Sequence, residues 1–387
     1  MKQLISLFLF ILLLLSACVK SYEPPAIKAK NNYLVIDGVI NTSTNGITTI
    51  VLSRSKNLID TVSFIPELNA KVSILSETGL TYNLVDSSQN GKYKSVPLNL
   101  NPKHQYKIQI RTANNRQYES SFVNAKTTPA IDSISWNQDA VNNGINLKVS
   151  THDPNNETKY YRWDFIETWQ HNTKEIAQWV NVNGYIRSLG IDFLNDPLQI
   201  HQCWTSSPSP NIVVANSIGL SKDVISLQPI HFIPFNDQRL TIRYSILVSQ
   251  YALSQDAYNY WQLVQNNSQS LGTLFDLMPS QLVSNILCVS DPSEPVIGYI
   301  SASSIQQKRL FIRNNEVNNW IKRIPGIDCI PQIIQTNPLD FRIYNFPDPS
   351  YAPWYFSGSN PPFLVIVKKT CVDCRLSGGE NVKPSFW

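Results

Sequence analysis

Seven short segments in which apolar and polar residues alternate lie between residues 33 and 123, and this pattern limits the fold more than any other feature of the chain. The alternation repeats every two residues, as in a strand with one face buried and the other in solvent. Asn, Gly, Ser and Pro separate the segments, as turn residues do. The segments are 33–41, 47–54, 71–75, 81–86, 93–96, 105–112 and 117–123. This pattern predicts an immunoglobulin-like β-sandwich over residues 33–125.

The segment 105–112 gives the sharpest local prediction. Its alternation places Tyr106, Ile108 and Ile110 on one face, which we expect to be buried. Leu100-Asn101-Pro102 precedes Tyr106 and resembles the tyrosine corner of immunoglobulin-like and fibronectin type III domains. In that motif the phenol hydroxyl donates a hydrogen bond to the backbone a few residues upstream. The alternative is an ordinary half-buried tyrosine.

Residues 126–318 repeat the strand patterns and predict a second, fibronectin-like sandwich. Its strands are expected at 131–136, 144–150, 160–169 and 239–251, with 297–303 and 309–313 closing it. The stretch 170–238 exceeds an ordinary loop and is predicted to be an insertion. Ser254 is a good N-cap for an amphipathic helix over 254–269. Residues 319–387 are predicted to form an irregular, disulfide-bearing tail, so the fold class is mainly β, with tandem sandwiches and one or two helices.

The N-terminus has the pattern of a targeting segment. Lys2 precedes an apolar run over 4–15, which is shorter than the roughly 20 residues that span a bilayer. Leu15-Ser16-Ala17-Cys18 ends the run and resembles a bacterial lipobox. We therefore expect a lipoprotein signal peptide at 1–17, a diacylglycerol and acyl lipid on Cys18, and a spacer through residue 32. The alternative is an ordinary cleaved signal peptide. A lipid on Cys18 predicts that the mature protein is tethered to a membrane and does not cross it.

Charge and composition narrow the classes of partner. The chain has 32 basic and 28 acidic residues, a net charge of +4, and no charged blocks. This distribution gives no footprint for nucleic acid. Hydrophobic residues make up 42% of the chain, which suffices for packed cores and argues against intrinsic disorder. No later stretch is apolar enough to predict a membrane span.

The five remaining cysteines all lie in the second half of the chain: Cys203, Cys288, Cys329, Cys371 and Cys374. An exported compartment favours disulfides, and an odd number leaves at least one thiol unpaired. We expect Cys329 to pair with Cys371 or Cys374. A zinc or redox role for the CxxC pair, and metal binding by His201 with Cys203, remain alternatives. No metal site and no cofactor beyond the lipid are predicted.

The chain shows no motif of a known catalytic class. It lacks a GxSxG elbow, an HExxH helix, a P-loop and a GxGxxG fingerprint. Asp164, Glu167, Asp192 and Asp196 could form an acid/base pair, but nothing fixes their separation. We therefore predict a non-enzymatic protein. Its candidate contact surface is a proline-rich loop at 347–362 that carries four aromatic side chains: Tyr351, Trp354, Tyr355 and Phe356.

Several motifs together resemble one family: Tyr161-Arg162-Trp163, Glu167-Thr168-Trp169, Cys203-Trp204, Val296-Ile297-Gly298-Tyr299 and Cys371-Val372-Asp373-Cys374-Arg375. With the lipobox, they resemble the domain of unknown function 4249 family of Bacteroidota lipoproteins. The resemblance implies an outer-membrane lipoprotein, on the periplasmic face or the cell surface, often encoded beside TonB-dependent receptors and without an established enzymatic activity. A role as accessory to such a β-barrel receptor follows as an expectation. The alternatives are a free-standing glycan- or peptide-binding lipoprotein and a metal-binding or redox protein.

Overall fold

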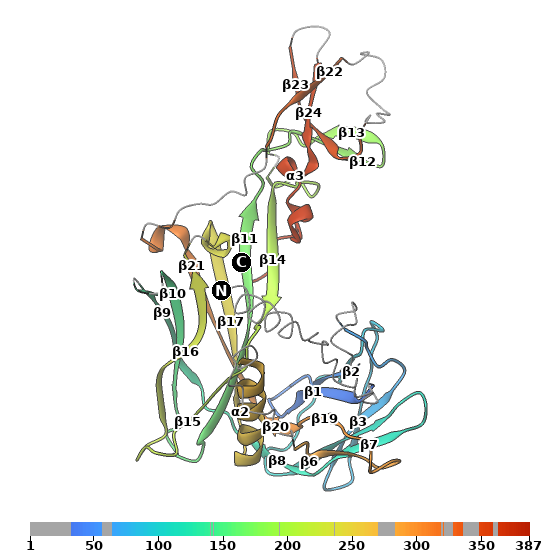
Figure 1. Cartoon of the computed structure of the whole chain (residues 1–387), viewed down its shortest axis with the longest axis vertical. Helices are drawn as coiled ribbons and strands as arrows, with labels where there is room; N and C mark the ends of the chain where they lie inside the picture. The colour runs from blue at the N-terminus through green and yellow to red at the C-terminus, as the bar shows by residue number, and fades with distance from the viewer. Residues whose placement is uncertain are drawn as a thin grey trace, which may run out of the picture.

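The computed structural model describes residues 32–55, 64–139, 141, 143–192, 194–235, 237–269, 283–318, 320, 328–335, 348–358 and 363–387. The fold is mainly β, which confirms the predicted class. Figure 1 shows two sandwiches and a smaller unit, the head, with the first sandwich at the bottom and the head at the top. Among the described helices, none is both long and apolar enough to cross a membrane.

The first sandwich contains β1 (Leu34–Asn41), β2 (Thr49–Arg54), β3 (Lys71–Ser76), β4 (Thr81–Leu84), β5 (Lys92–Lys94), β6 (Gln105–Arg111), β7 (Gln117–Ser120), β8 (Val123–Lys126), β18 (Ile286–Cys288), β19 (Ile297–Gly298) and β20 (Ser301–Ser303). In β6, the side chains of Tyr106, Ile108 and Ile110 are buried in the core, as the alternation predicts. The Tyr106 hydroxyl donates a hydrogen bond to the carbonyl of Asn101 at 2.9 Å. The predicted tyrosine corner is therefore present.

Three strands of the first sandwich come from a distant part of the chain. The sequence pattern assigns 297–303 to the second sandwich, and this expectation is wrong, because β19 and β20 both pair with β1 in parallel. At Gly298, φ is +140° and an added Cβ would lie 2.1 Å from the Ile36 carbonyl oxygen. Only glycine permits this approach. Local alternation identifies strands, but it carries no information about a partner some 260 residues away along the chain.

The second sandwich packs two sheets around Trp163, Phe165 and Leu147. One sheet holds β9 (Ile131–Asp139), β10 (Gly144–His152) and β16 (Val224–Pro234). The other holds β11 (Tyr160–Asn172), β14 (Gln202–Pro208), β15 (Val213–Asn216), β17 (Arg243–Ala252) and β21 (Ile305–Arg313). The short 3₁₀ helix η1 (Gln238–Leu240) lies between β16 and β17, and a second one, η2 (Asn314–Glu316), follows β21.

The predicted insertion at 170–238 is too long. Strands β14, β15 and β16 lie within it, yet they pair with β11 and β10 and are part of the sandwich. Both β14 and β15 pair with β11, and Pro208 and Pro210 stand at the break between them. Proline removes a backbone donor and interrupts a strand pattern, so the sequence reads this broken strand as a loop. Of the predicted insertion, the part between the end of β11 and the start of β14, residues 173–201, lies outside the second sandwich.

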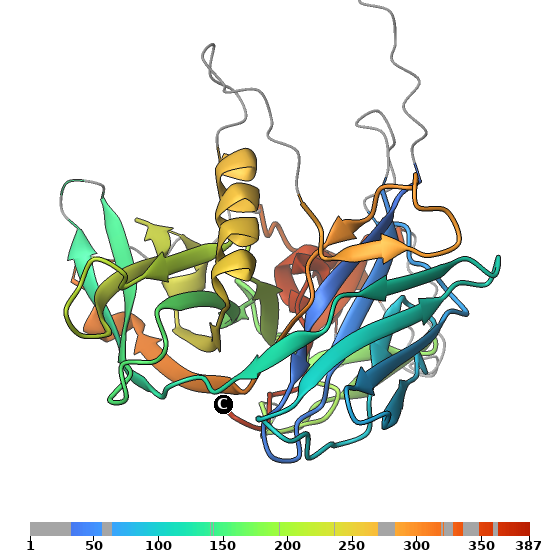
Figure 2. The ribbon, with the colours of Figure 1, turned by 90° about the horizontal axis from the view of Figure 1, so that it is seen from below.

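Helix α2 (Gln255–Gln269) confirms the predicted helix and its start. The Ser254 hydroxyl accepts a hydrogen bond from the Ala257 amide at 3.2 Å, as an N-cap does. The helix stands between the two sandwiches in Figure 2. Its buried residues pack in one cluster with Val39 and Tyr299 of the first sandwich and Tyr251 of the second. The helix therefore joins the two units through apolar contacts.

The head consists of residues 173–201 and the described residues from 328 to 377. It contains the hairpin β12 (Trp179–Val182) and β13 (Tyr185–Ser188), and a sheet of β22 (Gln332–Gln335), β23 (Tyr351–Ser357) and β24 (Phe363–Lys368). Helices α3 (Lys369–Val372) and η3 (Cys374–Ser377) follow. The predicted irregular tail is therefore a folded unit. Its core combines Val180, Leu189 and Ile200 with Val367 and Val372, so two separate chain segments build it.

Candidate functional site

The predicted lipidation site, Cys18, lies outside the described residues, as do 1–17 and the spacer up to residue 31. The structure therefore does not bear on the anchor. The other predicted site residues are described, and they fall into the head, its junction with β14, and the first sandwich.

Two disulfides fasten the head. Cys203 of β14 is bonded to Cys374, with the two Cα atoms 5.7 Å apart, and Cys329 is bonded to Cys371, at 5.8 Å. The sequence separations are 171 and 42 residues. Cys288 has no disulfide partner and is buried in the core of the first sandwich. The prediction of disulfides is confirmed, and the structure adds the pairing, which cysteine spacing does not specify.

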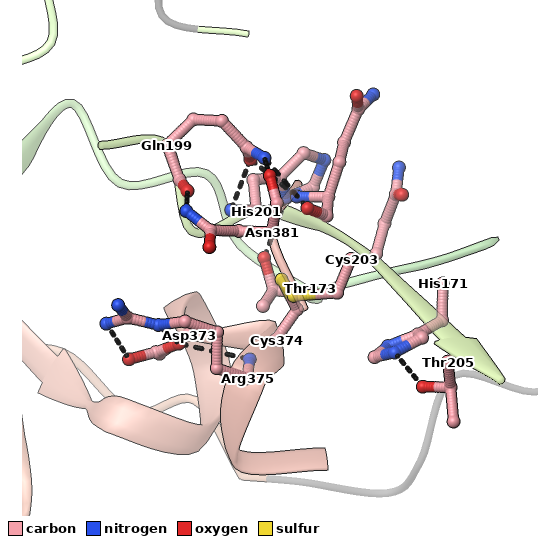
Figure 3. Close-up of a disulfide and its surroundings, with 12 residues drawn as sticks. His171, Thr173, Gln199, His201, Cys203, Thr205, Asp373, Cys374, Arg375 and Asn381 are labelled. Atoms are coloured by element: carbon pink, nitrogen blue, oxygen red, sulfur yellow. Dashed lines mark hydrogen bonds and ion pairs between the residues drawn. A yellow bond between two sulfur atoms is a disulfide. The ribbon is translucent and has the colours of Figure 1, made fainter. Parts of the chain in front are cut away.

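Hydrogen bonds hold the chain's last ten residues, which we call the C-terminal segment (378–387), against β14 beside the Cys203–Cys374 bond (Figure 3). The Asn381 amide donates to the Gln199 carbonyl at 2.7 Å, and the Gln199 amide donates to the Asn381 carbonyl at 3.1 Å. The backbones of Trp204 and Glu380 exchange two hydrogen bonds at 2.9 and 3.0 Å. The end of the chain is thus an additional edge partner of β14.

Two histidines flank this junction on opposite sides of Cys203. His171 Nε2 lies 2.9 Å from the Thr205 hydroxyl, and His201 Nδ1 lies 2.7 Å from the Thr173 hydroxyl (Figure 3). Burial lowers the pKa of both imidazoles below the usual value, so both rings are neutral at pH 7. The Cys203 sulfur is held in a disulfide, so the alternative of a thiolate metal ligand paired with His201 is not favoured. Within the described residues, no three His, Cys, Asp or Glu side chains converge as a metal site.

The four aromatic residues of the predicted contact loop lie in strand β23 instead. Tyr351, Trp354, Tyr355 and Phe356 are each half-buried, and the strand pairs with β24 along its length. Trp354, Tyr355 and Phe356 are consecutive residues of the strand, so the four rings do not share one face, and a register shift lies next to Trp354. Phe356 packs edge-on against Trp179 at 4.8 Å, while Trp354 packs against the head core. Of the prolines that suggest a loop, Pro353 lies at this register shift within β23.

A pocket of about 590 Å³ opens in the head between the hairpin and β23. Trp179, Asn181 and Tyr351 line it, together with Lys369 and Arg375. The Asp373 carboxylate binds the Arg375 guanidinium at 2.8 Å and raises its pKa, so Arg375 is a fixed cation at the rim. Of the predicted aromatic set, only Tyr351 contributes. Trp179 and Arg375 were missed because the hairpin and η3 are distant in sequence and come together only when the shared core of the head forms.

Comparisons with known proteins identify one family model. The model described as "Domain of unknown function (DUF4249)" matches residues 19–309. The match spans both sandwiches and the hairpin and ends within β21, so the motif from Cys371 to Arg375 lies beyond it. No curated protein matches the chain.

Two solved structures show a distant likeness to the chain. A DUF4785 family protein from Legionella pneumophila has 8% identity and a TM-score of 0.19, with 56% of this chain and 52% of that chain covered. The native conformation of Escherichia coli alpha-2-macroglobulin has 9% identity and a TM-score of 0.17, with 89% and 17% covered. The chain thus spans about half of the first protein and about a sixth of the second. At these scores neither likeness carries an argument about function.

Proposed function

Because the chain belongs to the domain of unknown function 4249 family, whose description assigns no activity, we propose a function from the chain's own features. We propose that it is a non-enzymatic lipoprotein anchored in the outer membrane by Cys18 and accessory to a TonB-dependent transporter. In this role it helps to capture the substrate or to gate the barrel. The barrel itself performs the transport.

The observation that carries the proposal is the position of the head relative to the first sandwich. The sequence from Cys18 to residue 31 leads into β1, and β1 belongs to the first sandwich at one end of the molecule (Figure 1). The head lies at the other end. A protein anchored through Cys18 would therefore present the head as the part furthest from its point of entry into the first sandwich. Two disulfides fix the head's chain segments, which lowers the entropy lost when a partner binds.

The surface of the head supports a contact with another protein. Ile330 and Ile333 are 70% and 69% exposed, and Phe363 on the neighbouring strand β24 is 36% exposed. Exposed apolar side chains gathered on one small unit are typical of interaction sites. Ile333 lies opposite Val365 in the β22–β24 pair, and Phe363 lies opposite Gln335, so both side chains belong to one sheet.

The proposal predicts that the barrel is retained through the head. Native outer membranes would be solubilised, the tagged lipoprotein purified, and bound barrel proteins quantified by mass spectrometry after crosslinking. We expect Ile333→Asp to lower barrel recovery by about tenfold or more, since an interface anchor contributes at least about 1.4 kcal/mol. The matched control is Leu80→Asp, because Leu80 is a similarly exposed residue (59%) of the first sandwich. Cys18→Ser should release the protein from the membrane fraction. Recovery of the wild-type lipoprotein with no barrel would overturn the proposal.

A further inference from the structure

A second pocket, which we call the cleft pocket, lies between the two sandwiches beside α2, the helix that stands between them in Figure 2. Residues 35–37 of β1, 162–166 of β11 and 208–212 line it, together with Tyr260 and Trp261 of α2. Its volume is about 450 Å³. Binding sites of about 300–1,000 Å³ occur preferentially at domain interfaces. The cleft pocket is therefore large enough to hold several side chains of a docked segment.

The walls of the cleft pocket are largely apolar. Ile166 is 49% exposed, whereas its neighbour Phe165 lies in the core of the second sandwich, so Ile166 belongs to the outer face of the sheet. The rings of Tyr260 and Trp261 pack edge-on with their centroids 5.3 Å apart, and Pro208 adds a further apolar side chain. An exposed apolar surface of this kind is typical of a docking site.

Three charged residues line the cleft pocket: Asp37, Arg162 and Asp164. Asp164 binds Arg162 at 3.1 Å, and the Arg162 guanidinium also lies 4.1 Å from the centroid of the Trp261 ring. Asp37 is exposed, and its carboxylate has no basic partner within the part of the chain that the structure describes. With two acidic side chains and one basic side chain, the pocket favours a basic occupant.

The chain enters the fold at one wall of this pocket. β1 begins at Leu34, and residues 35–37 already line the cavity. Residues 19–31 of the spacer precede it and carry three lysines and one glutamate, a net charge opposite to that of the pocket. Ile27 lies seven residues before Leu34, so an extended link between them reaches about 23–25 Å. This length exceeds the width of a compact cavity of about 450 Å³, so the spacer is long enough to fold back into it.

The spacer also carries apolar side chains suited to the cleft pocket. Tyr22, Pro24, Pro25 and Ile27 lie within six residues of one another. Proline-rich segments dock in grooves lined by aromatic side chains, because they lose little conformational entropy on binding. Attachment to β1 makes the docking intramolecular, and a short flexible linker gives an effective concentration in the millimolar range. A proline-rich peptide of another protein would have to compete with this tethered segment.

We propose that residues 22–27 of the spacer dock in the cleft pocket, with their prolines on the aromatic rings of α2 and the lysines that follow them near Asp37. Docking shortens the free tether and draws Cys18 toward the cleft between the sandwiches. The inference rests on the proposed function only for the lipid on Cys18. It goes beyond that function, because it assigns the face of the lipoprotein that is held at the membrane.

Trypsin digestion of the mature chain, from residue 18 and made without lipid by Cys18→Ser, tests the docking. We expect the bond after Lys28 to be cleaved about tenfold more slowly in this chain than after the further change Ile166→Asn, which removes an apolar wall of the pocket. The bond after Lys20 lies outside the docked residues and should be cleaved equally in both. Ile47→Asn is the matched control, because Ile47 is also 49% exposed but does not line the pocket. It should keep the protection.

Two further measurements keep the test valid if Ile166→Asn perturbs β11. The double variant Pro24→Gly/Pro25→Gly leaves every described residue unchanged, and it should lose the protection to a similar extent. A photoreactive amino acid in place of Ile27 should crosslink to residues 208–212 or 260–264 of the same chain. Mixing isotope-labelled and unlabelled chains distinguishes crosslinks within one chain from those between two copies.

Two outcomes would overturn the inference. One is cleavage after Lys28 that is as fast in the wild-type sequence as in Ile166→Asn and in the proline variant. The other is a crosslink from position 27 to a second copy or to residues outside the cleft pocket. All of these measurements use a lipid-free chain and no barrel. A failure here therefore differs from a failure of barrel recovery, which tests the proposed function.

Discussion

The carboxylate of Glu167 lies in the interior of the second sandwich and accepts hydrogen bonds from three sides. Arg239 Nη1 donates to it at 3.0 Å and the Tyr244 hydroxyl at 2.7 Å, while His231 Nε2 lies 3.0 Å away. Burial alone would raise the pKa of Glu167, but these neighbours outweigh it and hold the pKa below the usual value. The same balance holds at Asp237. Burial would raise the pKa of this carboxyl group, but its hydrogen bonds to Arg239 outweigh burial and lower the pKa. The network is thus stable only while its carboxylates are charged.

This network predicts acid sensitivity. A carboxyl group with a lowered pKa in the folded state stabilises the fold above its unfolded pKa, and that contribution is lost as the pH falls through the folded value. We expect the free energy of unfolding to fall between about pH 5 and pH 3. Glu167→Gln should cost about 2 kcal/mol at pH 7, because it removes the charged acceptor of Arg239 and of Tyr244, and should flatten this pH dependence.

The measurement is urea unfolding at pH 7 and at pH 3.5. Asp132→Asn is a suitable control, since Asp132 forms an exposed pair with His152 at 2.8 Å. Surface pairs contribute about 0–1 kcal/mol, so this variant should unfold almost as the wild type does. Equal losses in the two variants would show that the buried network is not the source of acid sensitivity.

At the scale of single elements, local sequence patterns predict the features that depend on neighbouring residues. The alternation in β6 and the N-cap of α2 both appear in the structure, because side-chain burial and capping depend on neighbours within a few residues. Parallel pairing of β19 and β20 with β1 depends on contacts across more than 250 residues. The sequence holds one trace of it, Gly298, but a single glycine within a strand does not name its partner.

Gly298 therefore provides the test of this pairing. Gly298→Ala should lower the free energy of unfolding by at least about 2 kcal/mol, because φ is +140° and the new Cβ would meet the Ile36 carbonyl. Gly219→Ala is the matched control, since no atom lies within 4 Å of the Cβ position there. Its effect should stay within about 0.5 kcal/mol. Thermal unfolding of the two variants side by side measures the difference, and a neutral Gly298→Ala would contradict the β1–β19 pairing.

In the head, too, the sequence could not predict which distant segments come together to form the candidate site. Its aromatic residues and its cysteines are visible in the sequence, yet residues 173–201 and the end of the chain are separated by more than 120 residues, and neither segment has a core of its own. The sequence consequently suggests an insertion and an irregular tail. Tyr351 was expected in the contact surface, while its pocket neighbours Trp179 and Arg375 become neighbours only after both segments fold together.

For the molecule as a whole, the two disulfides connect different parts of the structure. Cys329–Cys371 closes a short stretch within the head, whereas Cys203–Cys374 ties the head to the second sandwich. Loop-closure entropy assigns about 4 kcal/mol to a separation of 42 residues and about 5 kcal/mol to 171. The two bonds therefore contribute similar free energies, and what distinguishes them is where structure is lost when each is removed.

Hydrogen exchange should locate that loss. In Cys203→Ser/Cys374→Ser we expect protection to fall across residues 173–201 and 363–387, because the head and the C-terminal segment lose their covalent link to β14. In Cys329→Ser/Cys371→Ser the loss should be confined to 328–335 and 363–372, and the C-terminal segment should stay on β14 through Trp204 and Glu380. Strands β6 and β10 should remain protected in both variants, since their cores lie in the sandwiches. If both variants lost protection in the sandwiches, the head would be an integral part of one cooperative unit, and the three-part architecture would not describe how this molecule unfolds.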